Sequence, residues 1–193
     1  MKKIFIWLLA FLFFIPMDAG AEIRSSLQQA RLAYICALAD MAVYDTDMND
    51  VVRQEMDRLG WCFTDYRNKD ARANTVFYSL VNMQAEPGQR ETLIVIPGTE
   101  KLKDIEVDLR CSKVLFGGSN INEFRQYAEQ EKVDKNAPMV HRGFNDYTMT
   151  AFFTPRESGK IAADEIQKFL SESNDHLYIT GHSLGGAVAT LLG

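Results

Sequence analysis

The chain has 193 residues, of which 47% are hydrophobic and 24% charged, and its formal net charge is −5. This length is enough for one sizeable core, and the mildly acidic balance argues against nucleic acid as a partner. The three histidines and three cysteines show no metal-ligand spacing, so we expect neither a metal nor another cofactor.

The first 21 residues have the pattern of a secretory signal peptide. Residues 1–3 are a short basic start, residues 4–17 are almost wholly apolar, and residues 19–21 form an A-x-A arrangement. The apolar run is shorter than the ~20 residues that span a bilayer. We therefore expect cleavage after Ala21, export to the periplasm or the medium, and one domain over residues 22–193.

Export makes a disulfide permissible, but three cysteines cannot all pair within the chain. Cys36 lies in an apolar stretch with helical character and is expected to be buried as a small hydrophobe. The pairing of Cys36, Cys62 and Cys111 stays open.

Two helices and several strands are predicted in the first part of the chain. The helices cover residues 26–44, which are rich in Ala and Leu, and residues 51–59. Residues 92–96 form a continuous apolar run, the pattern of a buried central strand. Other β-forming stretches lie at residues 75–81, 114–116 and 139–140.

The last part of the chain predicts a helix, a buried strand and a second helix. Apolar residues fall on one stripe of a helix over residues 158–171. Residues 177–179 follow as a buried strand, and residues 187–192 are compatible with a helix. This alternation indicates a parallel α/β sheet, in which sites form beyond the carboxyl ends of the strands.

A G-x-S-x-G element, Gly181-His182-Ser183-Leu184-Gly185, lies between that strand and the last helix. Strand, sharp turn and helix are the context of a nucleophile elbow, which presents a serine hydroxyl for attack. Gly181 and Gly185 fit there because a side chain two residues from the serine would collide. The alternative is a Gly-rich turn with Ser183 as a helix cap.

An attacked ester carbonyl becomes an oxyanion, which needs two preorganised N–H donors. The backbone of Leu184 is expected to supply one. The loop Pro97-Gly98-Thr99, directly after a buried strand, is expected to supply the other from Thr99. An ordinary Pro-Gly turn is the alternative for this loop.

The run Ile-Thr-Gly-His-Ser-Leu-Gly-Gly-Ala around Ser183 resembles the serine signature of the class 3 lipases, a fungal-type family with the α/β-hydrolase fold. Gly98-Thr99 resembles the family's oxyanion motif, although Ile96-Pro97 stands where Phe-Arg is usual. Residues 101–109 match the position of the family's lid, and residues 140–144 resemble its Val-His-x-Gly-Phe motif. The resemblance covers roughly residues 32–193 and is strongest from residue 92.

The resemblance implies an α/β-hydrolase-like sheet flanked by helices. It implies a structural role for His141, and we expect His182 to be a packing residue and His176 a surface residue. The lid segment is heavily charged and short of apolar area. We therefore expect weak interfacial activation and a preference for polar or shorter-chain esters, unless the segment is simply a solvated helix.

In the class 3 lipases the triad order is Ser, Asp, His, and neither an acidic residue nor a histidine follows Ser183 in this sequence. We therefore expect the N-terminal part of a lipase domain, without the C-terminal part of the fold. The leading hypothesis is a secreted hydrolase of lipid or other carboxylic esters, acting through a Ser183 acyl-enzyme at a membrane or lipid surface. Thioesterases and feruloyl-type esterases are the nearest rivals, and an inactive fragment or pseudoenzyme that binds lipid or a protein is the alternative.

Overall fold

The computed structural model describes residues 23–44, 49–86, 88–98, 112–118, 121–130, 136–172 and 175–193. The expected signal peptide, Thr99, the lid segment and Cys111 lie outside the described residues. The chain divides into two compact units, Met1–Ile35 and Cys36–Gly193.

In the first unit, the described residues belong to helix α1 (Ile23–Ala42), which continues into the second unit. This helix confirms the prediction for residues 26–44, with ends shifted by two or three residues. Among the described helices, none combines the length and the apolar character needed to cross a membrane.

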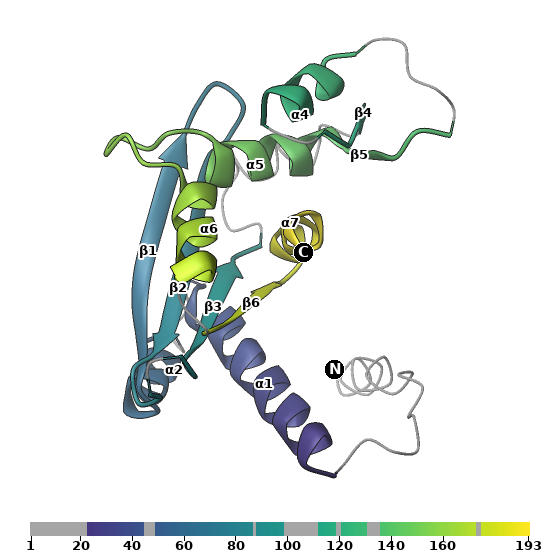
Figure 1. The fold of residues 1–193 in the computed structure, drawn as a ribbon. Helices are drawn as coiled ribbons and strands as arrows, with labels where there is room; N and C mark the ends of the chain where they lie inside the picture. The colour runs from purple at the N-terminus through teal and green to yellow at the C-terminus, as the bar shows by residue number, and fades with distance from the viewer. Residues whose placement is uncertain are drawn as a thin grey trace, which may run out of the picture. The chain divides into compact units, whose positions relative to one another are not determined.

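A four-stranded mixed sheet forms the centre of the second unit (Figure 1). Its order is β1 (Trp61–Lys69), β2 (Asn74–Asn82), β3 (Glu91–Ile96) and β6 (His176–Gly181). β3 and β6 are parallel, as predicted, but β1–β2 and β2–β3 are antiparallel, so the prediction of a parallel sheet is wrong for these pairs. Strands β1 to β3 follow one another through short turns, and a short turn can join only antiparallel neighbours.

Three helices pack on one face of this sheet, here called the first face. They are α5 (Arg142–Phe153), α6 (Ala162–Glu172) and α7 (Leu184–Leu192). Phe77, Ile94 and Ile96 of the sheet form a core with side chains of these helices, including Phe152 and Val188. Leu177 and Ile179 of β6 pack against this core, which together with the parallel pairing of β6 to β3 holds the turn after β6 in place.

The second face of the sheet carries α2 (Asn49–Arg58) and the last turns of α1. Arg53 of α2 lies over the rings of Phe63 and Tyr78, and Asp40 of α1 bonds to Thr180 of β6. These strand residues alternate with those of the first face, as the two-residue period of a strand requires.

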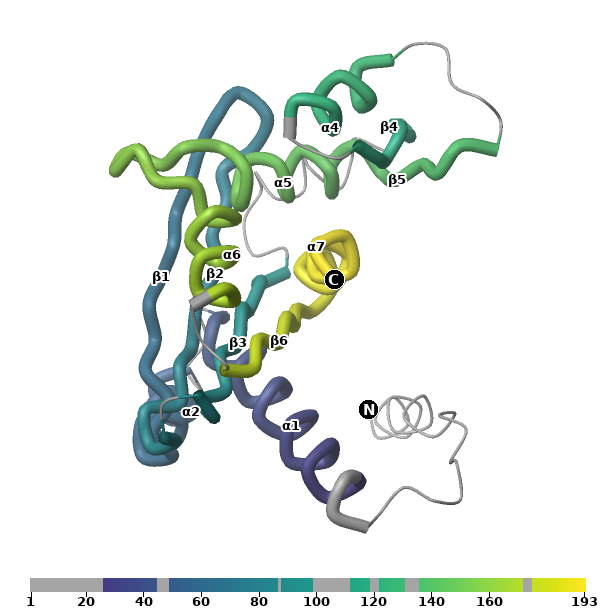
Figure 2. Tube along the Cα trace, in the orientation of Figure 1, coloured from purple at the N-terminus to yellow at the C-terminus, as the bar shows by residue number. Residues whose placement is uncertain are grey.

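A smaller antiparallel pair, β4 (Lys113–Leu115) and β5 (Met139–His141), confirms the two short strands predicted there. Helix α4 (Ile121–Ala128) packs on β4, and β5 runs directly into α5, as the trace in Figure 2 shows. Helices α4 and α5 and strand β1 were not predicted.

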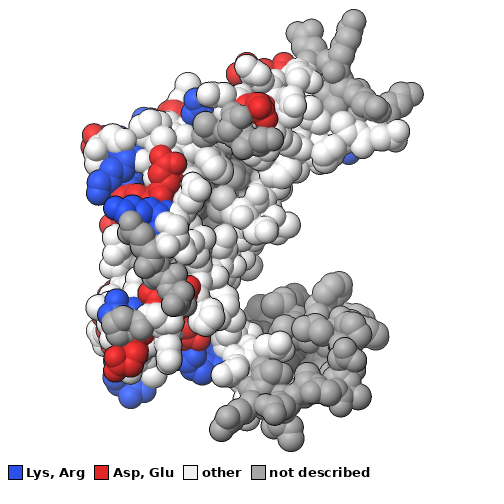
Figure 3. All heavy atoms as spheres, viewed as in Figure 1, with Lys and Arg blue, Asp and Glu red and all other residues white. Residues whose placement is uncertain are grey.

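The helix predicted over residues 158–171 begins only at Ala162. The preceding residues form a tight turn, with Gly159 at φ +77° and hydrogen bonds between Arg156 and both Gly159 and Lys160. Charged side chains of both signs are interspersed over the β1 and α6 side of the face in Figure 3, whereas α7, which has no charged residue, lies in an uncharged area.

Candidate active site

Ser183 lies in the sharp turn between β6 and α7. Its backbone has φ 56° and ψ −122°, and it is the only non-glycine residue with positive φ in the part of the chain that the structure describes. Such a conformation costs about 1–3 kcal/mol and persists only where the surrounding packing enforces it. The side chain is exposed, so the turn holds the hydroxyl out from the sheet, the geometry of a nucleophile elbow.

The close approach of three backbones requires the glycines on either side of Ser183. A Cβ on Gly185 would lie 1.8 Å from the Ile96 carbonyl oxygen, and one on Gly181 would lie 2.4 Å from the Gly185 carbonyl carbon. The first turn of α7 therefore rests directly on the end of β3, with no space for a methyl group at either position.

Leu184 is the first residue of α7, and its buried side chain belongs to the core of the first face. The N–H of the next residue, Gly185, bonds to the His182 carbonyl at 3.0 Å. Within the described residues, the N–H of Leu184 has no hydrogen-bond partner. The positive end of the α7 dipole lies at the same point, so this N–H can donate to an anion beside Ser183.

The structure does not describe Thr99, but it places the residue before it against the nucleophile. A Cβ on buried Gly98 would lie 3.1 Å from the Ser183 Cβ and 2.7 Å from the His182 carbonyl oxygen. The loop after β3 and the elbow after β6 are therefore in contact, and their roles as the two sides of an oxyanion hole stay a prediction.

Tyr44, which the sequence analysis did not single out, connects these two segments. Its Oη accepts a hydrogen bond from the Gly98 N–H at 2.8 Å and lies 2.9 Å from His182 Nδ1. His182 is exposed and hydrogen-bonded rather than simply packed. No sequence pattern relates residues 44, 98 and 182, because only the folded sheet brings them together.

Asp40 and Cys36 lie beneath the elbow on the second face. Burial raises the pKa of the Asp40 carboxyl to about 6, although a hydrogen bond from the Thr180 hydroxyl at 3.0 Å and the charge of His182 lower it. Burial, followed by the charge of Asp40, raises the pKa of the Cys36 thiol to about 11. Cys36 is half-buried and Cys62 exposed, and both thiols are free.

None of the three histidines is hydrogen-bonded to Ser183. His141 caps α5 by accepting the Phe144 N–H at 3.4 Å, which fits the structural role expected for it. His176 is exposed at the start of β6, and His182 bonds to Tyr44. In the described ranges, no three His, Cys, Asp or Glu side chains lie together as a metal site would need.

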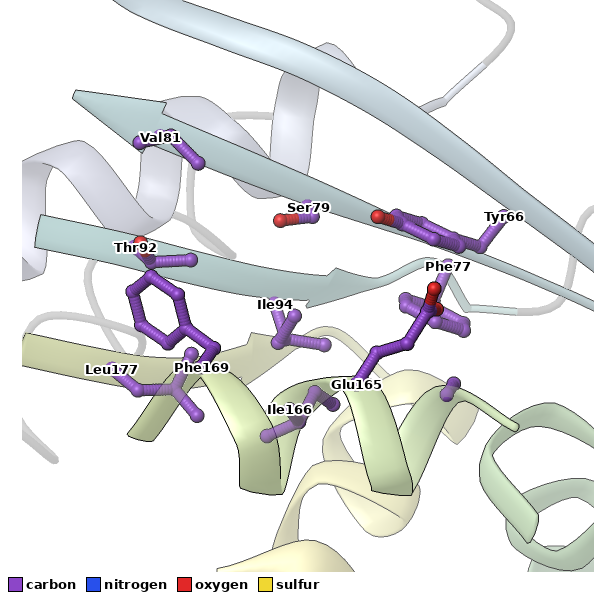
Figure 4. Close-up of a pocket in the computed structure, with 11 residues that line it drawn as sticks. Tyr66, Phe77, Ser79, Val81, Thr92, Ile94, Glu165, Ile166, Phe169 and Leu177 are labelled. Atoms are coloured by element: carbon purple, nitrogen blue, oxygen red, sulfur yellow. The ribbon is translucent and has the colours of Figure 1, made fainter. Parts of the chain in front are cut away.

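A cavity of about 220 Å³ lies between α6 and the sheet (Figure 4). Its lining includes Thr92 and Leu177, which lie near the starts of their strands, and Phe169 of α6. Ser183 follows the carboxyl end of β6 and is not among the residues that line the cavity.

Comparison with known proteins supports what this geometry suggests. The family model described as Lipase (class 3) matches residues 93–193, just over half of the chain, from β3 to the end of α7. A search of the curated proteins gave no match, and a search of the solved structures gave none either. The matched region includes both the elbow and the loop after β3, and the family implies lipase-type hydrolysis of lipid esters in general. The chain belongs to the class 3 lipase family.

Proposed function

We propose that this protein is an exported serine hydrolase of lipid and other carboxylic esters, which acts through an acyl-enzyme on Ser183. The conformation of Ser183, at φ 56° between a parallel strand and a helix, carries the proposal. The same serine in a mere capping role would need no such strain, and its side chain makes no capping hydrogen bond.

In this mechanism the Ser183 Oγ forms a bond to the ester carbonyl carbon while its proton passes to a histidine base. The negative charge moves to the carbonyl oxygen, where the N–H groups of Leu184 and Thr99 stabilise it. The C–O bond to the alcohol then breaks, and the alkoxide takes the proton from the histidine. Water hydrolyses the resulting acyl-enzyme by the same steps in reverse order.

We propose that the base and its acidic partner come from chain that follows Gly193. The resemblance to the class 3 lipases supports this, because there the acid and the histidine both follow the nucleophile. Sequencing the gene downstream of codon 193 tests it: an Asp and then a His within about 150 further residues would agree, and a natural stop codon at 194 would favour a pseudoenzyme.

The apolar segment at residues 4–17 supports export, and the charged segment at residues 100–106 supports weak interfacial activation. A steep rise in rate above the solubility limit of a triglyceride would contradict the second expectation. Recovery of the protein in the cytoplasm with residues 1–21 intact would contradict the first.

A fluorophosphonate probe tests the nucleophile in the protein as its gene encodes it. We expect covalent labelling of the wild type, measured by intact mass, and none of Ser183→Ala. Ser112→Ala, at an exposed serine outside the turn, is the matched control and should label like the wild type. No labelling of the folded wild type would overturn the mechanism.

A further inference from the structure

The strongest unassigned feature near the elbow is the hydroxyl of Tyr44. A hydroxyl has two acceptor lone pairs and one proton. The Tyr44 Oη accepts from the Gly98 N–H at 2.8 Å, and its own proton can go to His182 Nδ1 at 2.9 Å. It therefore joins the loop after β3 to the turn after β6 through one oxygen atom.

This connection lies just beyond the point where the two strands stop pairing. The register of β3 and β6 ends at Ile96 opposite Gly181. Gly98 lies two residues after Ile96 and directly precedes Thr99. His182 lies one residue after Gly181 and directly precedes Ser183. Among the described residues no ladder hydrogen bond joins the two segments there, so the Tyr44 hydroxyl adds a polar connection to the backbone packing of Gly185 against Ile96.

The backbone that carries Tyr44 is held by several hydrogen bonds. The Asn49 side chain of α2 bonds to the Tyr44 carbonyl oxygen, and Arg53 Nε donates to the Ala42 carbonyl at 2.8 Å. Asp40, one helical turn earlier, accepts the Thr180 hydroxyl at 3.0 Å. The end of α1 and the backbone of Tyr44 are thus tied to α2, and Asp40 ties the same helix to β6.

We propose that Tyr44 is a positioning residue that sets the width of the oxyanion hole, by holding Gly98 and His182 at a fixed separation. The proposal rests on the function proposed above. Tyr44 acts on the two donor-bearing segments and not on the reacting atoms. The N–H donors must both lie about 2.7–3.1 Å from one oxygen, and a displacement of about 1 Å can cost about 10²-fold in rate.

Tyr44→Phe tests this in the protein as its gene encodes it, because the change keeps the ring and removes only the hydroxyl. With a short-chain p-nitrophenyl ester we expect kcat to fall about 10- to 100-fold and KM to change less than about 2-fold. Tyr34→Phe is the matched control, since Tyr34 is a tyrosine of α1 whose side chain is 61% exposed. It should have wild-type kcat.

A double-mutant cycle separates positioning from general structural damage. His182→Ala removes the second partner of the same hydroxyl from an exposed site, and we expect it to lower kcat about 3- to 10-fold in the wild type. In the Tyr44→Phe background it should lower kcat no further, because the connection is already broken. Additive losses would overturn the proposal. If Tyr44→Phe does not fold, the His182→Ala kcat alone decides, and a wild-type value would overturn the proposal.

The outcomes separate this proposal from the proposed function. If the wild type labels at Ser183 and Tyr44→Phe keeps its kcat, the function stands and the role of Tyr44 is overturned. If the folded wild type does not label at all, the proposed function fails and the role of Tyr44 falls with it.

Discussion

At the scale of single residues, the elbow depends most strongly on Gly185. Gly185→Ala should lower the free energy of unfolding by about 3 kcal/mol, because its Cβ would meet backbone that cannot move aside. Urea unfolding measures this. Gly117→Ala is the control, since a Cβ there meets only the Tyr127 ring at 3.8 Å, and its stability should stay the same or rise by up to about 1 kcal/mol. A wild-type free energy of unfolding for Gly185→Ala would mean that the turn has space for a methyl group beside the Ile96 backbone.

Asp40 gives a prediction about pH. Its folded-state pKa, about 6, lies above the ordinary value of 3.8, so the folded protein holds this proton more tightly than the unfolded one. Its contribution to stability therefore rises as the pH falls from about 6 to about 4. Asp40→Asn removes the buried charge, and we expect a higher Tm at pH 8 and an unchanged Tm at pH 4.

The control for Asp40→Asn is Asp65→Asn, at an exposed carboxyl on β1 paired with Arg67. It should change the free energy of unfolding by less than about 0.5 kcal/mol at pH 8. If Asp40→Asn lowers Tm at pH 8, the hydrogen bond from Thr180 to the charged carboxylate outweighs the burial of that charge.

The elbow was predictable because its signal is local: glycines, a serine and a flanking apolar run within ten residues. The Tyr44 connection was not, because its hydrogen bonds join residues 54 and 138 positions apart. A tyrosine just after the end of a helix has no local feature that distinguishes it from a packing residue. Long-range polar contacts are therefore the part of the site that required the structure.

At the scale of elements, α5 and the sheet are joined by the buried side chain of Tyr147. Its hydroxyl bonds to both the N–H and the carbonyl of Val76, at 3.1 and 2.8 Å. Val76 lies beyond the pairing of β2 with β3, which begins at Tyr78 opposite Val95. The Tyr147 hydroxyl thus makes the two hydrogen bonds that a paired residue of β3 would otherwise make to Val76.

Tyr147→Phe should therefore lower the free energy of unfolding by about 2 kcal/mol, since it leaves two backbone groups without a partner. Chemical denaturation measures the change. Tyr178→Phe, at a partly buried hydroxyl on β6 with no hydrogen bond among the described residues, is the control and should change it by less than about 0.5 kcal/mol. Equal effects would show that the hydroxyl of Tyr147 is solvated.

Two threonines, on β3 and β2, form a second matched pair. The buried Oγ1 of Thr92 has no partner among the described residues, whereas that of Thr75 donates to the Asn68 carbonyl at 3.1 Å. Thr92→Val should raise the free energy of unfolding by about 1 kcal/mol, and Thr75→Val should lower it by about 1 kcal/mol. A lower free energy of unfolding in both variants would indicate that water or an undescribed residue bonds to Thr92.

The elements that were predicted are those with continuous or strongly periodic apolar residues, such as β3, β6 and α6. β1 was missed because mostly exposed and half-buried residues interrupt its apolar positions, with Trp61 alone fully buried. Periodicity also said nothing about strand direction. The mixed sheet follows instead from the short turns between β1, β2 and β3.

At the scale of the whole molecule, β6 is the last strand of the described sheet, and its outer side is unpaired there. An apolar strand edge with unpaired backbone groups promotes association. A polypeptide of residues 22–193 is therefore expected to self-associate at micromolar concentration, as measured by light scattering. A stable monomer would show that this edge is covered by residues within the 193.

The position of α7 has a topological consequence. Helices α5 and α6 on the first face connect β3 to β6, and α7 lies on that same face. Connections between parallel strands of one sheet are almost always right-handed. Successive connections that pass over the same face therefore place each new strand on the same side of the strand before it. Any parallel strand that follows α7 would therefore add at the outer side of β6 and point its carboxyl end toward Ser183. A strand in that position would have its carboxyl end beside the nucleophile.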